Sequence, residues 1–183
     1  MEKIIKIGGV DVRLKSTAAT PLIYKNQFKT SFMTDLMLLS KAFQNGTNVQ
    51  KMSYNQLKNV DLDIFYNFVW VLAKGADKNI EPPLEWFEKF EEFNLQEVMN
   101  EVMDLLTASI GGTKKVDNVS GSDEPLTDEQ FYIMMNKIGV SLSDMENMTI
   151  AQCLDYVQEW IDLNTESENT SSRKATQSDF DAF

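Results

Sequence analysis

The residue types that most often carry acid–base and metal chemistry are scarce in this sequence. It contains no histidine and one cysteine, Cys153. Histidine is the commonest general base and metal ligand, so a histidine-based triad and a zinc site of Cys and His are both excluded. Cys153 lies on a predicted apolar helical stripe with Leu154 and Val157. We therefore interpret it as a buried structural thiol rather than a nucleophile.

Carboxylates and glycines are present, but their spacing favours structural roles. Asp61 and Asp63 open a predicted helix, where anions suit the positive end of the helix dipole. Ile110-Gly-Gly-Thr-Lys-Lys lacks the spacing of a phosphate-binding loop, and Asp123–Asp128 lacks the alternating oxygen ligands of a calcium loop. Four glutamates on one helical face are expected to be solvated: Glu85, Glu88, Glu91 and Glu92. We expect no catalytic residue, no metal site and no cofactor, and interpret the protein as a non-enzyme.

The 183-residue chain carries a net charge of −11, and this charge is unevenly distributed. Residues 1–115 hold 14 basic and 14 acidic side chains, which sum to zero, whereas residues 116–183 hold 3 basic and 14 acidic side chains, which sum to −11. An acidic segment repels nucleic acid and attracts basic partners. The distribution therefore argues against nucleic-acid binding and gives a first indication of two units.

The sequence predicts neither a membrane span nor a signal peptide. No apolar run approaches the roughly 20 residues that a membrane-spanning helix needs. Met1–Lys6 is not followed by an apolar segment of the kind that a signal peptide requires. A single cysteine fits a reducing compartment. We expect a cytoplasmic protein with no membrane partner.

The predicted fold is mainly α and begins with a β-hairpin. Lys3–Ile7 and Val10–Leu14 are rich in β-branched residues, and Gly8-Gly9 suits a tight turn with positive φ. Apolar residues at helical spacing then predict a helical bundle. Its helices are expected to begin near Thr20-Pro21 and to cover Ser31–Phe43, Asp61–Lys74, Leu84–Phe93 and a segment after Asn94. Further capping and stop signals lie at Asn45-Gly46, Ser53–Gln56 and Gly75.

A polar, Gly/Ser-rich segment over residues 111–124 is the clearest linker. It divides a hairpin-plus-helix domain over residues 1–110 from a small helical hairpin over residues 125–163. Residues 164–183 are rich in Ser, Thr and Asn and are predicted to be disordered. The second unit is small, so we expect it to be loosely folded until a partner binds. A capping box at Thr127–Gln130 is expected to start its first helix, and Ser143–Glu146 and Thr149–Gln152 are expected to cap a turn and a further helix.

The remaining functional candidates are surfaces for partner proteins. Flexible Met side chains suit adaptable binding grooves, and the chain has ten of them, although core filling is the simpler interpretation of each one. An exposed hairpin edge suits self-association, and replacing Val12 with Pro is expected to abolish it. Two phenylalanines in the acidic segment 179–183 suit a short docking motif. The partner-binding candidates are Val10, Val12, Met99, Met103, Met134, Met135, Phe180 and Phe183.

The segment Ile5–Phe28 contains the run Lys6-Ile-Gly-Gly-Val-Asp-Val-Arg-Leu-Lys-Ser-Thr-Ala-Ala-Thr-Pro21. This run resembles the opening hairpin-and-helix segment of tail assembly chaperones from siphophages and prophages of Gram-positive bacteria. The second unit is similar to the downstream extension of the same family, over Pro125–Tyr132, Gly139–Met145, Asp155–Ile161 and Arg173–Phe183.

The resemblance implies a function. Such chaperones bind the tape measure protein, keep its long hydrophobic helices soluble, recruit tail tube subunits and are absent from the finished virion. By resemblance, residues 1–110 would coat the tape measure protein in the host cytoplasm, and residues 125–183 would recruit the major tail tube protein. Many members have a short form and a frameshifted long form, and the segment 111–124 lies where such a junction would fall.

Three other functions compete with this one. A helical adaptor or inhibitor that binds a host target would not solubilise a tape measure protein on co-expression. An enzyme that works through carboxylates, such as a hydrolase, would need a deep pocket lined by convergent acidic groups. A nucleic-acid-binding helix–turn–helix over residues 126–163 is opposed by the negative charge of that segment.

Overall fold

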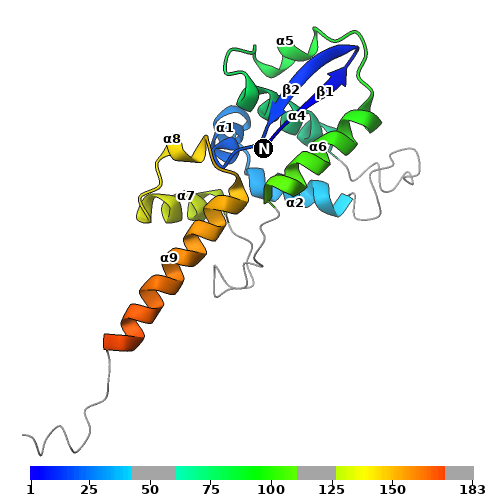
Figure 1. Cartoon of the computed structure of the whole chain (residues 1–183). Helices are drawn as coiled ribbons and strands as arrows, with labels where there is room; N and C mark the ends of the chain where they lie inside the picture. Colours follow the sequence, from blue (N-terminus) through cyan, green and yellow to red (C-terminus); the bar gives the residue numbers. More distant parts are fainter. Residues whose placement is uncertain (43–60, 111–126, 172–183) are drawn as a thin grey trace, which may run out of the picture.

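The computed structural model of this protein describes residues 1–42, 61–110 and 127–171. Within these ranges the chain is mainly helical and begins with a β-hairpin, as predicted (Figure 1). Several predictions lie outside the described residues, namely those for Asn45-Gly46, Ser53–Gln56, the linker over 111–124, Phe180 and Phe183.

The hairpin consists of β1 (Glu2–Ile7) and β2 (Val10–Lys15), which pair antiparallel along their length. Gly8 and Gly9 form its turn with φ values of 55° and 79°, the positive angles that a two-residue primed turn requires. Alternate residues face the helices and are buried, whereas charged residues line most of the opposite face. The buried set is Ile5, Ile7, Val12 and Leu14.

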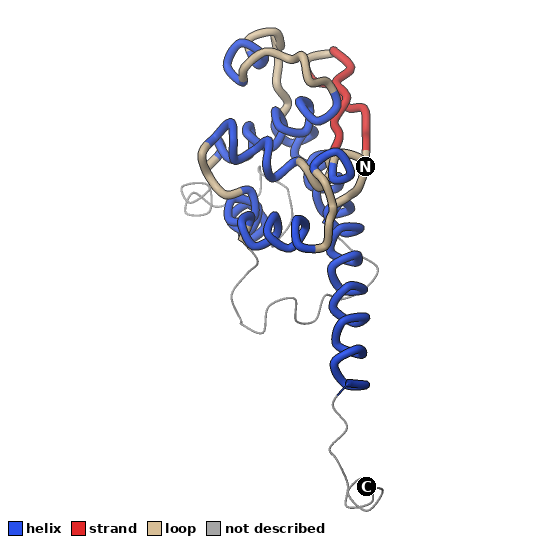
Figure 2. Tube along the Cα trace, turned by 90° about the vertical axis from the view of Figure 1, so that its left-hand side faces the viewer, coloured by secondary structure: helices blue, strands red, loops and turns tan. Residues whose placement is uncertain are grey.

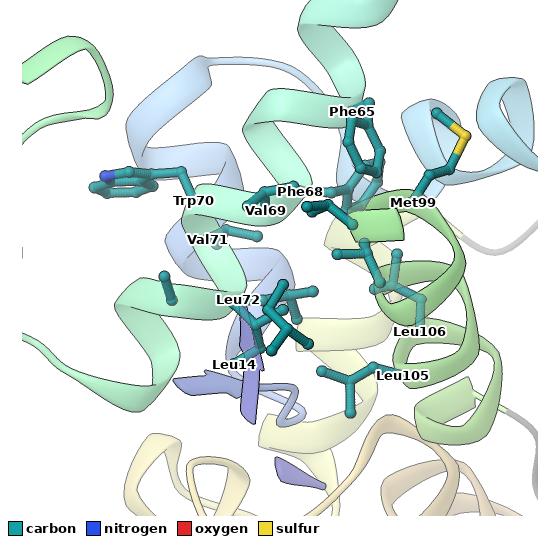
Figure 3. Packing of buried hydrophobic residues seen from close by; sticks show 14 of the residues in the cluster. Leu14, Phe65, Phe68, Val69, Trp70, Val71, Leu72, Met99, Leu105 and Leu106 are labelled. Carbon is teal, nitrogen blue, oxygen red and sulfur yellow. The ribbon is translucent and has the colours of Figure 1, made fainter. Parts of the chain in front are cut away.

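Helix α4 (Leu62–Ala76) forms the centre of the main core. It begins where the Asp61 carboxylate accepts a hydrogen bond from the Asp63 N–H at 3.0 Å, which satisfies one of the free donors of the first turn. Figure 3 shows α4 side chains packed with Leu14 of β2 and with residues of α6 (Leu95–Ile110). The buried residues of α4 are Phe65, Phe68, Val69, Trp70, Val71, Leu72 and Ala73.

Gly75 does not end α4, contrary to the prediction, because the helix continues to Ala76. A Cβ at Gly75 would lie 2.6 Å from the backbone oxygen of Lys15. The glycine therefore allows the helix to approach the end of β2 closely, and its role is packing rather than termination.

Helices α1 (Thr20–Phe28) and α2 (Phe32–Ala42) add an aromatic cluster to this core. Tyr24 is fully buried and stacks on Phe68 with a centroid separation of 5.1 Å. Its hydroxyl donates a hydrogen bond of 2.8 Å to the Asp35 carboxylate. A buried hydroxyl without a partner would destabilise the fold, and this bond supplies one.

The helix predicted over Leu84–Phe93 is shorter than expected, since α5 covers Pro83–Phe87. The chain that follows passes over the hairpin turn, where a Cβ at Gly8 would lie 2.7 Å from the Glu92 backbone oxygen. This close backbone packing replaces the later turns of the predicted helix.

The C-terminal part consists of α7 (Asp128–Lys137), α8 (Leu142–Met145) and α9 (Ile150–Ser171). The capping boxes predicted at Thr127–Gln130 and Thr149–Gln152 are both present as reciprocal hydrogen bonds.

The capping box predicted at Ser143–Glu146 is wrong. The box that starts α8 is formed by Ser141 and Asp144, because Ser141 Oγ accepts the Asp144 N–H at 3.2 Å and the Asp144 carboxylate accepts the Ser141 N–H at 3.0 Å. The helix thus starts two residues earlier than the pattern indicated.

Helix α9 extends away from the rest of the molecule (Figures 1 and 2). It runs to Ser171, so it continues past residue 164, where the tail was predicted to begin. The prediction for residues 172–183 lies outside the described residues.

The two predicted units share packing and hydrogen bonds. The Asp128 carboxylate of α7 is fully buried and accepts the N–H groups of Phe32 and Met33 at 3.0 and 3.3 Å, which completes the first turn of α2. The Ala18 N–H donates to the Met148 carbonyl at 2.8 Å. Ala18 and Ala19 also complete a second core cluster with Phe131, Met135, Met145, Cys153 and Val157.

Candidate functional site

The residue types that could carry chemistry, cysteine and the carboxylates, lie in surroundings that favour structural roles. Cys153 is fully buried in the second core cluster, and burial raises the pKa of its thiol to about 11. A thiol that stays protonated near neutral pH is a poor nucleophile. Within the described ranges, no cluster of three or more acidic or cysteine side chains is placed to hold a metal ion. No described helix is long and apolar enough to span a membrane.

A row of large apolar side chains is exposed on α9. Tyr156, Trp160 and Leu163 are 59%, 41% and 60% exposed. Their spacing of four and three residues places them along one face of the helix. A neighbouring face carries Cys153 and Val157 into the second core cluster. We call the exposed row the α9 stripe; a contiguous apolar row of this kind indicates a protein-binding surface more strongly than scattered exposed residues do.

Acidic residues run directly beside the α9 stripe. Asp155, Glu159 and Asp162 each precede a stripe residue by one position, so they form a parallel row. Residues 127–164 hold seven acidic and one basic side chain, which sum to −6. Two of the seven are paired with the N-terminal part, Glu129 with Lys25 and Glu146 with Lys78. An apolar row beside an acidic row suits an amphipathic partner with basic flanks.

A second apolar surface lies between α2 and α6. A depression of about 330 Å³ is lined by Leu36, Ser40, Met103, Thr107 and Ile110. Met37 and Leu38 follow Leu36 in α2, and their side chains are 39% and 51% exposed. A largely apolar depression between two helices suits the apolar face of another helix.

A third hollow follows β2 and measures about 520 Å³. Val10, Val12 and Arg13 form one side of it, and Ala76 and Trp86 belong to the opposite side. We call this hollow the β2 groove.

The structure separates the partner-binding candidates into buried, surface and undescribed groups. Met99 and Met135 are fully buried in the two core clusters, where they act as core packing. Met134 is half-buried against the second cluster, and Met103 lines the α2–α6 depression. Val10 is 50% exposed, whereas Val12 is largely buried, and both line the β2 groove. Phe180 and Phe183 lie outside the described residues.

Tyr156, Trp160 and Leu163 were not predicted as binding residues, although the sequence held the signal. The helical stripe drawn through Cys153 and Val157 leaves a second row of apolar residues at the same periodicity. A helix with two apolar faces can bury one in its own core and present the other.

The described residues thus present three surface features: the α9 stripe, the α2–α6 depression and the β2 groove. The three features lie on different elements. No protein-family model matches this chain, and no curated protein or solved structure matches it either.

Proposed function

We propose that this protein is a tail assembly chaperone of a long-tailed bacteriophage, which binds the tape measure protein and recruits tail tube subunits. The resemblance of Ile5–Phe28 to the opening of that family supports the proposal. The single structural observation that carries it is the α9 stripe, Tyr156, Trp160 and Leu163, exposed beside an acidic row.

The α9 stripe supplies the surface for recruitment of the tail tube protein. A helix that extends from the body can be reached by a large subunit without obstruction by the core (Figure 1). Aromatic residues such as Trp160 and Tyr156 contribute disproportionately to binding energy when a partner buries them. The neighbouring acidic row steers a basic partner and sets its orientation.

The α2–α6 depression supplies the surface for the tape measure protein. Its apolar lining, including Leu36 and Met103, suits the apolar face of a long helix. Covering that face would keep a hydrophobic helix from aggregating. Self-association remains part of the proposal, since many copies are needed to cover a long protein.

Deleting the C-terminal unit would be a poor test of this division. A chain ending at Ser109 would lose Asp128, which completes the first turn of α2, and Ile150, which belongs to the main core. Loss of binding would then reflect a damaged N-terminal part. Surface substitutions on α9 avoid this problem.

The test is co-purification with the tape measure and major tail tube proteins of the same phage. The variant Tyr156→Ala/Trp160→Ala is expected to lose the tube protein by about tenfold or more while still solubilising the tape measure protein. The matched control Leu84→Ala removes an apolar side chain that is 73% exposed on α5. It is expected to retain both partners.

Two outcomes would contradict the proposal. If the intact chain retains neither partner, a helical adaptor or inhibitor of a host target becomes the better explanation. If the α9 variant and the α5 variant lose the tube protein equally, the α9 stripe is not its binding surface.

A further inference from the structure

The β2 groove lies along the edge of a strand, which distinguishes it from a pocket between helices. Four consecutive strand residues, Val10 to Arg13, line one side of it. The other side is formed by α4 and by α5 with the chain around it, through Ala73, Ala76, Asp77, Ile80, Trp86, Lys89 and Phe90. At about 3.4 Å per residue, the exposed edge is long enough for roughly four residues of an added strand.

The backbone of β2 has unused hydrogen-bonding groups in this groove. Met1 and Ser16 exchange two backbone hydrogen bonds of 2.8 Å across the hairpin. Antiparallel pairs alternate, so Lys3–Leu14, Ile5–Val12 and Ile7–Val10 also bond across the hairpin. The N–H and C=O groups of Asp11 and Arg13 therefore point outward. Among the described residues, neither backbone has a hydrogen-bond partner outside the hairpin.

The groove is closed at one end of this edge and open along the rest. The outward carbonyl of Lys15 lies against Gly75, where a Cβ would come within 2.6 Å of it. Helix α4 thus meets the strand at Lys15 and leaves the space beside Arg13 and Asp11 unfilled. Unpaired strand groups beside an apolar wall form a template for another strand.

Three of the four charged residues of the groove are ion-paired within the molecule. Asp11 pairs with Lys6 at 2.9 Å, and Arg13 pairs with Glu2 at 2.8 Å. Lys89 pairs with Glu81, and the Asp77 carboxylate accepts the Asn79 N–H at 2.9 Å. The groove lining holds two acidic and two basic side chains, which sum to zero, so the groove attracts neither sign of charge and favours an uncharged segment.

We propose that the β2 groove binds an uncharged, extended segment of another protein as a third strand on the outer edge of β2. The backbone of the segment bonds to Asp11 and Arg13. Its alternate apolar side chains face Ala73, Ala76 and Trp86. The proposal is independent of the chaperone function, because it concerns a different surface and a strand rather than a helix.

A second copy of the hairpin fits this groove less well than a single extended segment. In a symmetric pairing of two β2 edges, each copy would bring its own α4 and α5 to the space beyond the strand. Those elements already occupy the far side of the groove, through residues such as Ala76 and Trp86. An isolated strand adds no such bulk.

The ligand test uses a fluorescent hexapeptide of alternating Val and Thr, with the full-length protein in a polarisation assay. Two N-methylated versions carry the methyl groups on the Val nitrogens or on the Thr nitrogens. Successive residues of a strand point their N–H groups to opposite edges, so one version should bind about tenfold or more weakly than the other. Equal behaviour of the two versions would overturn the proposal.

The protein test fills the groove without touching the hairpin. Ala76→Phe adds a ring to the groove wall, and it is expected to weaken hexapeptide binding by about tenfold or more. Ala108→Phe is the matched control, because Ala108 is exposed on α6 and does not line the groove. Circular dichroism should show that both variants are folded. Equal binding by the two variants would overturn the proposal.

Two further measurements exclude other occupants. If sedimentation shows an oligomer of the unmodified protein that Ala76→Phe dissociates, a second copy fills the groove and the proposal fails. If a chain ending at Ser171 binds the hexapeptide more tightly than the full chain, the protein's own C-terminal residues are the occupant and the proposal also fails.

Discussion

The N-terminal and C-terminal parts of this protein differ in net charge and in the size of their hydrophobic cores. The N-terminal part is neutral over residues 1–115 and has a large core around α4. The C-terminal part has a small core that borrows Ala18 and Ala19, and seven of its eight charged side chains over residues 127–164 are acidic. The first part therefore carries most of the buried core and an open strand edge, whereas the second carries an acidic helix with an exposed apolar row.

The largest effect is expected from the centre of the N-terminal core. Leu72 is fully buried in α4, so Leu72→Ala is expected to lower the free energy of unfolding by about 2–5 kcal/mol. Denaturant unfolding followed by circular dichroism measures this change. Leu163→Ala is the control, since Leu163 is 60% exposed and its loss should cost less than about 0.5 kcal/mol. Similar losses of unfolding free energy for the two variants would contradict the assignment of the main core to the N-terminal part.

The next effect concerns the link between the two parts. Asp128→Ala leaves the N–H groups of Phe32 and Met33 without their acceptor, which is expected to cost about 2–4 kcal/mol. Hydrogen exchange should become faster in α2 as well as in α7, because the carboxylate joins these helices. Asp144→Ala, which removes an exposed cap of α8, should affect α8 locally. Unchanged exchange in α2 would show that the two parts are independent.

Alkaline pH should destabilise the C-terminal core. Burial raises the pKa of Cys153 from 9.0 to about 11, so the folded state keeps a proton that the unfolded state loses. The stability is therefore complete below pH 9 and declines between pH 9 and 11, by at most about 1.4 kcal/mol per pH unit. Cys153→Ala should flatten this dependence between pH 9 and 10. A dependence that is the same in both proteins would rule out the thiol as its cause.

The smallest expected effect separates the two binding surfaces by their charge. Replacing Glu159 and Asp162 with Lys should weaken the proposed binding of the tail tube protein by several-fold at low salt, roughly 1 kcal/mol, and added salt should reduce the difference. The same substitutions should leave hexapeptide binding to the β2 groove unchanged. If the affinity for the hexapeptide also fell with added salt, charged residues of the β2 groove would contribute to its binding.

Much of the fold was predictable because its signals are local. The hairpin follows from Gly8-Gly9 between two β-branched runs, and α4 follows from its apolar spacing and the Asp61 cap. The shortened α5 and the packing role of Gly75 were not predictable, because both depend on where the backbone meets the hairpin. The late end of α9 also escaped prediction, since its last residues carry little apolar periodicity.

The candidate surfaces were predictable to different degrees. The α9 stripe follows from the spacing of Tyr156, Trp160 and Leu163 once the helix is assumed. The β2 groove does not, because Arg13, Ala76 and Trp86 are distant in sequence and meet through tertiary packing.

Strand register also decides which backbone groups of β2 lie on the free edge of the hairpin. The N–H of Val12 points toward Ile5, so Val12→Pro would disrupt the hairpin itself rather than its outer edge.

The buried Asp128 carboxylate also sets an order of events during synthesis. It bonds to a backbone group 96 residues earlier in the chain. At about 5–20 residues per second, the ribosome delivers this carboxylate roughly 5–20 s after α2 has been made. Throughout that interval, the N–H groups of Phe32 and Met33 lack this acceptor. Any product that terminated within residues 111–124 would never gain it.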